Sequence, residues 1–190
     1  MIVLNVPNFI TLSRIILIPL IIGLFYLPDD LLSQQGKNVT ATAVFILAAI
    51  TDWLDGYLAR RLNQTSAFGE FLDPVADKLF VVGALVALLW LNRVDMLVGL
   101  IIIGREIAIS ALREWMAKVG QARSVAVAFI GKLKTVSQMI AIPLLLYQDE
   151  LLFIDCQWLG TVLVNIAAVL TVASMLYYLR KALPHAAVRN

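Results

Sequence analysis

The sequence has one cysteine, one histidine and few charged residues, and each of these scarcities excludes a class of protein. Cys156 has no second cysteine with which to form an intramolecular disulfide or to share a zinc site. Charged residues make up only 15% of the chain, and the net charge is +2. Because no basic run with interleaved aromatic residues accompanies this weak charge, nucleic acid is excluded as a partner.

Hydrophobic residues are abundant instead, at 61% of the 190 residues, against roughly 45–50% in soluble domains. They occur in runs close to the roughly 18 residues that a helix needs to cross a bilayer. The strict alternation of a membrane β-barrel is absent. The sequence therefore predicts an all-α integral membrane protein surrounded by lipid.

Six apolar segments are predicted to cross the membrane as one bundle, because no repeat or long linker divides residues 1–190 into domains. Pro19 interrupts the first segment and is expected to bend it. A short interfacial helix is predicted before that segment, at residues 1–6. The six predicted spans are residues 8–27, 39–58, 72–91, 96–116, 131–147 and 153–179.

Basic residues indicate the orientation, since loops on the cytoplasmic side are enriched in Lys and Arg. With the N-terminus inside, all 15 Lys and Arg residues except Lys37 and Arg93 fall at or toward the cytoplasmic side. Both termini are therefore predicted to lie in the cytoplasm.

Four aspartates lie at the cytoplasmic ends of the second and third predicted spans. Their spacings of three and four residues place each pair on one helical face, and antiparallel helices would let the two faces meet. Four carboxylates at a membrane boundary would be strongly unfavourable alone. Two divalent cations, Mg²⁺ or Mn²⁺, would neutralise them and accept such oxygen ligands. Helix capping explains any one of these residues but is a poor explanation for all four, namely Asp52, Asp55, Asp73 and Asp77.

Small residues accompany the carboxylates. Gly56, Ala59 and Gly69 lie on or between the same faces, where the lack of side-chain bulk would let a ligand approach. Close helix packing within a membrane explains these residues equally well.

The complete pattern resembles the signature of the CDP-alcohol phosphotransferases. It reads D-x-x-D-G-x-x-A-R, then eight residues, then G-x-x-x-D-x-x-x-D, and residues 52–77 match every fixed position. The resemblance implies six transmembrane helices, a two-metal site open to the cytoplasm and a homodimer. It also implies that Asp52, Asp55 and Asp73 ligate the metals and that Asp77 is both ligand and general base. The implied CDP-diacylglycerol site is lined by Gly56, Ala59, Arg60 and Gly69.

Direct transfer of the phosphatidyl group fits these residues better than a covalent intermediate does. Asp77 would take the proton of the acceptor hydroxyl as this group attacks the phosphate that carries diacylglycerol. A covalent route would need a positioned nucleophile. The only histidine, His185, follows Pro184 in a polar tail and has no evident partner there.

A second group of charges bears on the acceptor. Arg105 and Arg113 lie in the apolar fourth span, eight residues apart and close to one face. Arginine within a membrane is costly enough to indicate a buried partner or an anionic ligand, such as an acceptor phosphate. Anchoring by the positive-inside rule is the alternative, with Glu106 and Glu114 pairing with basic neighbours. The predicted ligands of the acceptor phosphate are Arg105, Arg113, Lys132 and Lys134.

The outer segments NVPNFITLSRIILIP, GREIAISALREW and GKLKT resemble the bacterial members of this family that form phosphatidylglycerophosphate. The resemblance implies glycerol 3-phosphate as the acceptor, CMP as the second product and a place in the bacterial inner membrane. Asn8, Thr11 and Arg14 are candidate contacts for the cytidine or diphosphate of the donor. Helix capping and interfacial anchoring explain these three residues equally well.

Three alternatives predict different behaviour. Another acceptor, such as serine or inositol phosphate, would keep the acidic pattern and change the acceptor pocket. An ion or proton transporter also uses intramembrane acids, but these acids lie at one end of the spans without a second polar step. A purely structural membrane subunit predicts that loss of the four aspartates impairs folding alone.

Overall fold

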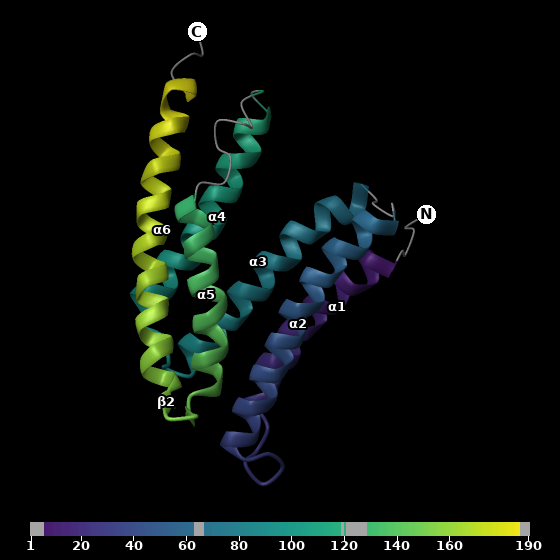
Figure 1. Ribbon diagram of the computed structural model, residues 1–190, viewed down its shortest axis with the longest axis vertical. Coiled ribbons are helices and arrows are strands. Elements are labelled where there is room, and N and C mark those ends of the chain that lie inside the picture. Colours follow the sequence, from purple (N-terminus) through teal and green to yellow (C-terminus); the bar gives the residue numbers. More distant parts are fainter. Residues whose placement is uncertain (1–5, 63–66, 119, 121–128, 187–190) are drawn as a thin grey trace.

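The protein is an all-helical bundle in a computed structural model, which describes residues 6–62, 67–118, 120 and 129–186 (Figure 1). Side chains are described for these residues except 6–10, 53–62, 67, 68, 70 and 184–186. A two-stranded hairpin of β1 (Glu150–Leu151) and β2 (Ile154–Asp155) joins the last two helices. The helices are α1 (Val6–Leu24), α2 (Gln34–Leu62), α3 (Ala67–Trp90), α4 (Met96–Lys118), α5 (Phe129–Tyr147) and α6 (Cys156–Ala186).

Each predicted apolar segment forms a helix, which confirms the all-α prediction with ends that differ by a few residues. The sequence did not predict the hairpin, which takes residues 153–155 from the start of the expected sixth span. α1 continues through Pro19 to Leu24. The predicted interfacial helix falls almost wholly on residues 1–5, outside the described residues.

Two helices in the described part of the chain are long and apolar enough to cross a membrane, at Phe129–Tyr147 and Cys156–Leu183. Only 44% and 33% of their apolar windows are buried inside the bundle, so most of each window faces outward, unlike a soluble core helix. In α2, Lys37 and Asp52 bound a shorter apolar stretch. Together with exposed large apolar side chains such as Phe129 and Val169, these helices indicate membrane association.

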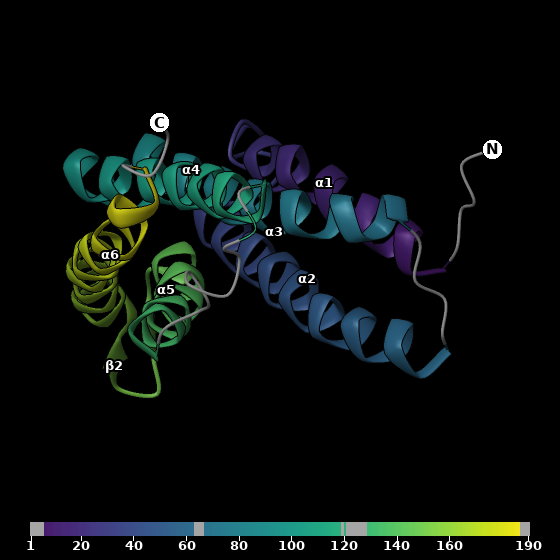
Figure 2. The same cartoon turned by 90° about the horizontal axis from the view of Figure 1, so that it is seen from above.

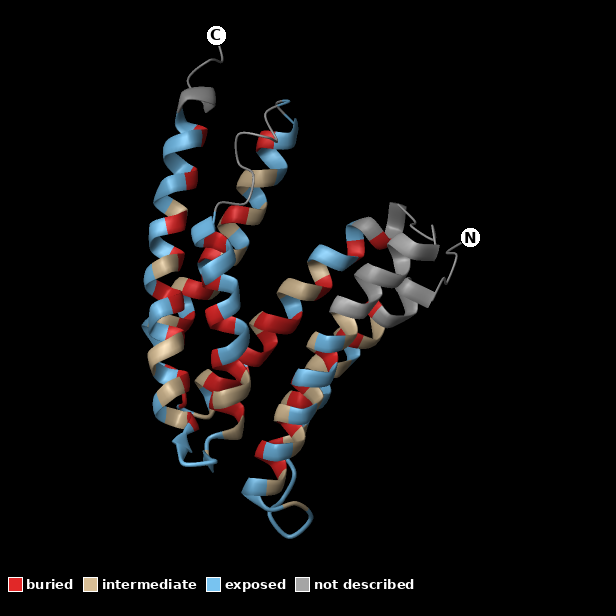
Figure 3. Ribbon diagram, viewed as in Figure 1, coloured by how far each residue is buried: buried red, intermediate tan, exposed pale blue. Residues whose placement is uncertain are grey.

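The helices alternate in direction, so α1, α3 and α5 begin at the end of the bundle where α2, α4 and α6 finish (Figure 1). α1 packs on α2 and α3, while α5 packs on α2 and α6. Seen from above, α1 and α2 lie to one side and α5 and α6 to the other (Figure 2). Buried residues line the faces between helices, and exposed residues cover the outside (Figure 3).

Aromatic and small residues set the helix spacing in the core. Phe45 of α2 stacks on Phe80 of α3, with ring centroids 4.9 Å apart. A Cβ atom on Gly83 would lie 2.3 Å from Cγ2 of Ile18, so glycine is what allows α3 to approach α1 this closely. Such small residues are the usual means of close helix packing in membranes.

Acidic residues at the end of the bundle opposite Asp52 cap helices. The backbone N–H of Leu97 donates to Asp95 Oδ1 at 2.8 Å, and that of Trp158 donates to Asp155 Oδ1 at 2.8 Å. These carboxylates satisfy N–H groups that have no partner within the first turn of a helix. Capping, the alternative explanation for the aspartates of residues 52–77, is thus seen at Asp95 and Asp155.

Arg93 joins three parts of the chain at this same end. Its guanidinium donates to the carbonyl oxygens of Leu145 (3.2 Å) and Leu146 (2.7 Å) and to Oδ1 of Asn38 (2.7 Å). Arg93 is only 6% exposed, and this burial lowers its pKa, while nearby Asp149 raises it. Because a buried charge is costly without partners, these bonds tie the α3–α4 turn to α2 and α5.

We predict that Arg93→Ala lowers the free energy of unfolding by about 1.5–3 kcal/mol, the usual value of hydrogen bonds to a charged group. Thermal unfolding of the detergent-solubilised protein measures the change. Lys118→Ala is the control, since Lys118 pairs with Glu114 on the exposed face of α4 and exposed pairs contribute little. Equal shifts for the two variants would contradict the role assigned to Arg93.

Candidate active site

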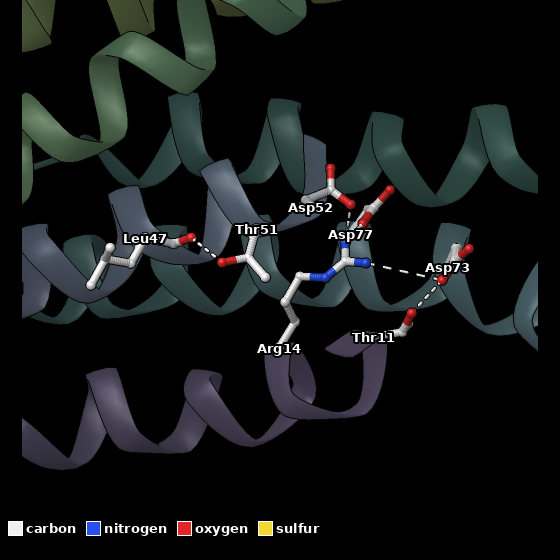
Figure 4. A network of polar contacts seen from close by, with 7 residues as sticks. All are labelled: Thr11, Arg14, Leu47, Thr51, Asp52, Asp73 and Asp77. Atoms are coloured by element: carbon white, nitrogen blue, oxygen red, sulfur yellow. Dashed lines mark hydrogen bonds and ion pairs between the residues drawn. The ribbon is translucent and has the colours of Figure 1, made fainter. Parts of the chain in front are cut away.

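Three of the four predicted aspartates converge beside α1. Asp52 lies toward the end of α2, whereas Asp73 and Asp77 are four residues apart on one face of α3 (Figure 4). Both α2 and α3 pack along α1, and they touch each other through side chains such as the stacked rings of Phe45 and Phe80. The carboxylates therefore meet as expected, and they do so beside α1, on which both helices pack.

Arg14 of α1 stands between these carboxylates. Its Nη1 donates to Oδ1 of both Asp52 and Asp77, and its Nη2 lies 4.0 Å from Oδ1 of Asp73 (Figure 4). One turn earlier, the hydroxyl of Thr11 donates to Asp73 Oδ1. α1 thus supplies one permanent cation and one hydroxyl to an acidic centre built by α2 and α3.

The burial of this cluster is uneven. The side chain of Arg14 is 3% exposed, whereas those of Asp52, Asp73 and Asp77 are 44%, 52% and 46% exposed. The guanidinium therefore closes the cluster from the protein side, and the carboxylates keep part of their surface open to a ligand.

A second charged group lies where α4, α5 and α6 meet. Lys134 of α5 donates to Oε1 of Glu106 on α4, and Arg105 Nη1 lies 3.6 Å from the same oxygen. Arg105 also donates from Nη2 to Oγ of Ser174 on α6, at 3.1 Å. Lys134 and Arg105 are both buried, so Glu106 provides the negative charge that two buried cations need.

The other two predicted phosphate ligands, Arg113 and Lys132, do not contact Glu106 in the described contacts. Arg113 is on the same face of α4 as Arg105, as predicted: Cζ of Arg105 lies 5.9 Å and Cζ of Arg113 lies 5.5 Å from the ring centroid of Tyr178. Lys132 of α5 is exposed. Its neighbour Lys134 therefore takes the inward position.

One cavity joins the two charged groups. It has a volume of about 240 Å³ and is lined by Asp52 and Asp77 from the acidic centre and by Glu106 and Lys134 from the second group. Lys78, Thr135 and Gln138 complete its polar lining. Residues far apart in the sequence are thus brought to one space, which spacing along the chain could not show.

Several predicted site residues fall where the structure describes no side chain. These are Asn8, Asp55, Gly56, Ala59 and Arg60, so their predicted roles stay predictions. Gly69, near the start of α3, is buried. The side chain of His185 is likewise outside the described set.

The acidic centre fits divalent metal ions in its chemistry. Its donors are carboxylate oxygens, which hard cations such as Mg²⁺ and Mn²⁺ prefer. Among the side chains that the structure describes, no three acidic, histidine or cysteine residues form a ready-made metal cage. The guanidinium of Arg14 lies among the same three carboxylates.

Two residues have more partners in the structure than the sequence indicated. Arg14 was only a candidate donor contact, and Glu106 was only a possible neutraliser of basic neighbours. An arginine three residues after Thr11 in an apolar helix was the available signal for the first. For Glu106 the signal was a carboxylate beside Arg105 within an apolar span, which requires a buried partner.

Comparisons with known proteins agree with this site. The profile of the CDP-alcohol phosphatidyltransferase family matches residues 4–175. A CDP-diacylglycerol–glycerol-3-phosphate 3-phosphatidyltransferase of Shigella flexneri serotype 5b is 46% identical over 184 residues, which cover 94% of each chain. Proteins of the same name from Salmonella choleraesuis and Escherichia coli strain K12 show the same identity and coverage.

We predict that Glu106→Ala lowers the free energy of unfolding by about 3–5 kcal/mol, because Lys134 and Arg105 then lose their buried counter-charge. The double variant Glu106→Ala/Lys134→Met should recover much of this loss, since both charges of the closest pair are then gone. Denaturant or thermal unfolding of the single and double variants measures the difference. A double variant less stable than Glu106→Ala would contradict the pairing, and Glu114→Ala on the exposed face is the control.

Proposed function

Because the chain belongs to the CDP-alcohol phosphatidyltransferase family, we propose that it transfers the phosphatidyl group of CDP-diacylglycerol to sn-glycerol 3-phosphate. The products would be phosphatidylglycerophosphate and CMP. The similar proteins carry this activity in their names. The observation that supports it most is the cavity in which Asp52 and Asp77 of the acidic centre face the same space as the buried Lys134.

Asp52, Asp73 and Asp77 are proposed to hold two divalent ions, Mg²⁺ or Mn²⁺, together with Asp55, which the family pattern adds. When bound, the ions supply positive charge that offsets the carboxylates and the diphosphate of the donor. The half-exposed carboxylates support this assignment, since they are reachable from the solvent side.

Asp77 is proposed to act as the general base, because its side chain lines the cavity in which the acceptor would bind. It takes the proton of the acceptor hydroxyl while that oxygen bonds to the phosphorus that carries diacylglycerol. The bond from this phosphorus to the oxygen that bridges the two phosphates breaks, and CMP leaves with the electron pair.

Lys134 and Arg105 are proposed to bind the phosphate of the acceptor, while Glu106 holds the Lys134 ammonium at the cavity wall. Charge-assisted hydrogen bonds to phosphate are strong. Two buried cations around the single carboxylate of Glu106 leave one excess positive charge, which can bind the phosphate. A volume of about 240 Å³ is below the roughly 300–1,000 Å³ of drug-sized ligand sites. It therefore favours a small acceptor in this cavity, with Arg113 and Lys132 farther out.

The donor is proposed to bind beside the acidic centre. Thr11 lies there, bonded to Asp73, and is the proposed donor contact nearest to these carboxylates. The remaining proposed contacts come from the family pattern and the first predicted span: Asn8, Gly56, Ala59, Arg60 and Gly69.

We further propose that residues 1–190 form one domain whose six helices span a bacterial inner membrane, with both termini and the active site in the cytoplasm. The two basic residues at the opposite end support this orientation, because each already has a partner. Lys37 pairs with Asp29 at 2.7 Å, and Arg93 bonds to Asn38 and two carbonyls. A homodimer is proposed from the family resemblance.

Release of CMP by the purified protein tests the proposed function. The protein is given CDP-diacylglycerol and Mg²⁺ or Mn²⁺, with glycerol 3-phosphate, serine, inositol 1-phosphate or no acceptor in parallel. Release with glycerol 3-phosphate alone, abolished by EDTA, is expected. Release with another acceptor would overturn the acceptor assignment, and no release under any condition would overturn the enzyme assignment.

Asp77→Asn should lower kcat by at least about 10²-fold, the scale of losing a general base. Binding of CDP-diacylglycerol should change little, because the donor has other contacts. Asp95→Asn removes a carboxylate that caps α4 at the other end of the bundle and should keep normal turnover. Near-normal kcat in Asp77→Asn would remove Asp77 from the mechanism.

Arg105→Ala should mainly raise the KM for glycerol 3-phosphate, since a phosphate contact made in both ground and transition states affects binding more than kcat. Steady-state CMP release at varied acceptor concentration measures it. Arg93→Ala is the matched control, because it removes a buried arginine far from the cavity. An unchanged KM in Arg105→Ala would place the phosphate elsewhere.

A further inference from the structure

Arg14 has an incomplete set of partners for so deeply buried a cation. Nη1 serves two carboxylates at once, Nη2 is 4.0 Å from the third, and Nε has no hydrogen-bond partner among the described residues. A buried arginine with a purely structural role would be expected to have a hydrogen-bond acceptor for each of its N–H groups. The guanidinium is therefore placed by charge more than by hydrogen-bond geometry.

The charge on this cluster is also incomplete. One guanidinium faces three carboxylates of Asp52, Asp73 and Asp77, so the described groups keep an excess of negative charge. Arginine stays protonated at any pH that the protein survives, so it cannot lose its charge to make room for another cation. A divalent ion bound by the same carboxylate oxygens would repel it at close range.

The structure provides a place to which the side chain can move. A cavity of about 210 Å³ is lined by Arg14 itself and by Ser13, Leu17, Val44, Leu47, Ala48 and Thr51. Because this lining offers no negative charge, the Arg14 guanidinium is expected to enter the cavity only when other cations at the aspartates repel it.

We infer that Arg14 is an exchangeable counter-ion, which holds the three aspartates together in the metal-free protein and is displaced into the adjacent cavity when divalent ions bind. This inference rests on the proposed metal site. It has two consequences: Arg14 competes with the metal and weakens its binding, and it stabilises the protein only while the metal is absent.

Binding of Mn²⁺ to the purified full-length protein tests the inference, with free Mn²⁺ counted by electron paramagnetic resonance. Arg14→Gln should bind Mn²⁺ about tenfold more tightly or better, because an adjacent cation changes the affinity of a carboxylate for a proton by about 10- to 1,000-fold. Arg14→Lys keeps the charge and should stay within a few-fold of the wild type. The thermal unfolding temperature of Arg14→Gln should be below wild type without metal and close to it with saturating Mn²⁺.

Lys37→Ala is the matched control, because Lys37 is also a buried, ion-paired cation and lies about 22 Å from Asp52 along α2. It should lower the unfolding temperature equally with and without Mn²⁺ and leave Mn²⁺ affinity unchanged. If Arg14→Gln folds only with metal, purification in Mn²⁺ followed by chelation should unfold it, which supports the inference.

Unchanged or weaker Mn²⁺ binding by Arg14→Gln would overturn the inference, as would equal destabilisation in both metal states or failure to fold even with Mn²⁺. The proposed metal site fails separately. That site would be refuted if the wild-type protein bound no Mn²⁺, or if Asp77→Asn bound Mn²⁺ as tightly as the wild type does.

Discussion

The guanidinium of Arg14 is the point at which α1, α2 and α3 are joined at the active-site end of the bundle. Asp52 of α2 and Asp77 of α3 share one of its nitrogens, and both of these helices pack on α1. Carboxylates gathered at a membrane boundary repel one another and lose hydration, so a cation has to accompany them. The position of α1 follows from this need as much as from its apolar packing.

The two ends of the bundle use charge differently. At the far end, Asp95 caps α4 and Arg93 is bonded to backbone carbonyls, so these two charges are satisfied by fixed partners. At the active-site end, carboxylates stay half-exposed. Around Lys134 and Arg105 the cations outnumber the single carboxylate of Glu106. Charge that is left unbalanced within a low-dielectric bundle is available to ions and phosphates, which is the property that phosphatidyl transfer needs.

Much of this organisation could be predicted from the sequence, because it depends on local spacing. The apolar runs predicted the six helices, and the spacing of Asp73 and Asp77 predicted their common face. The eight-residue separation of Arg105 and Arg113 likewise predicted that both would lie on one side of α4, where Tyr178 contacts them.

What could not be predicted depends on packing between segments distant in the sequence. No local pattern shows that Arg14 stands among the aspartates, or that Lys134 rather than Lys132 turns inward. The hairpin before α6 was missed because Leu152 and Phe153, both at positive φ, are not turn-forming residues. The sequence predicted divalent cations among these acids; the structure places Arg14 of α1 there, and the metal ions stay a prediction.

Anomalous diffraction from crystals of the Mn²⁺-bound protein is the measurement that tests the acidic centre most directly. Two anomalous peaks beside the carboxylates of Asp52, Asp73 and Asp77 are expected, with the Arg14 side chain turned away from them. Absence of a peak at these carboxylates under saturating Mn²⁺, with Arg14 still joining Asp52 to Asp77, would contradict the metal-dependent mechanism.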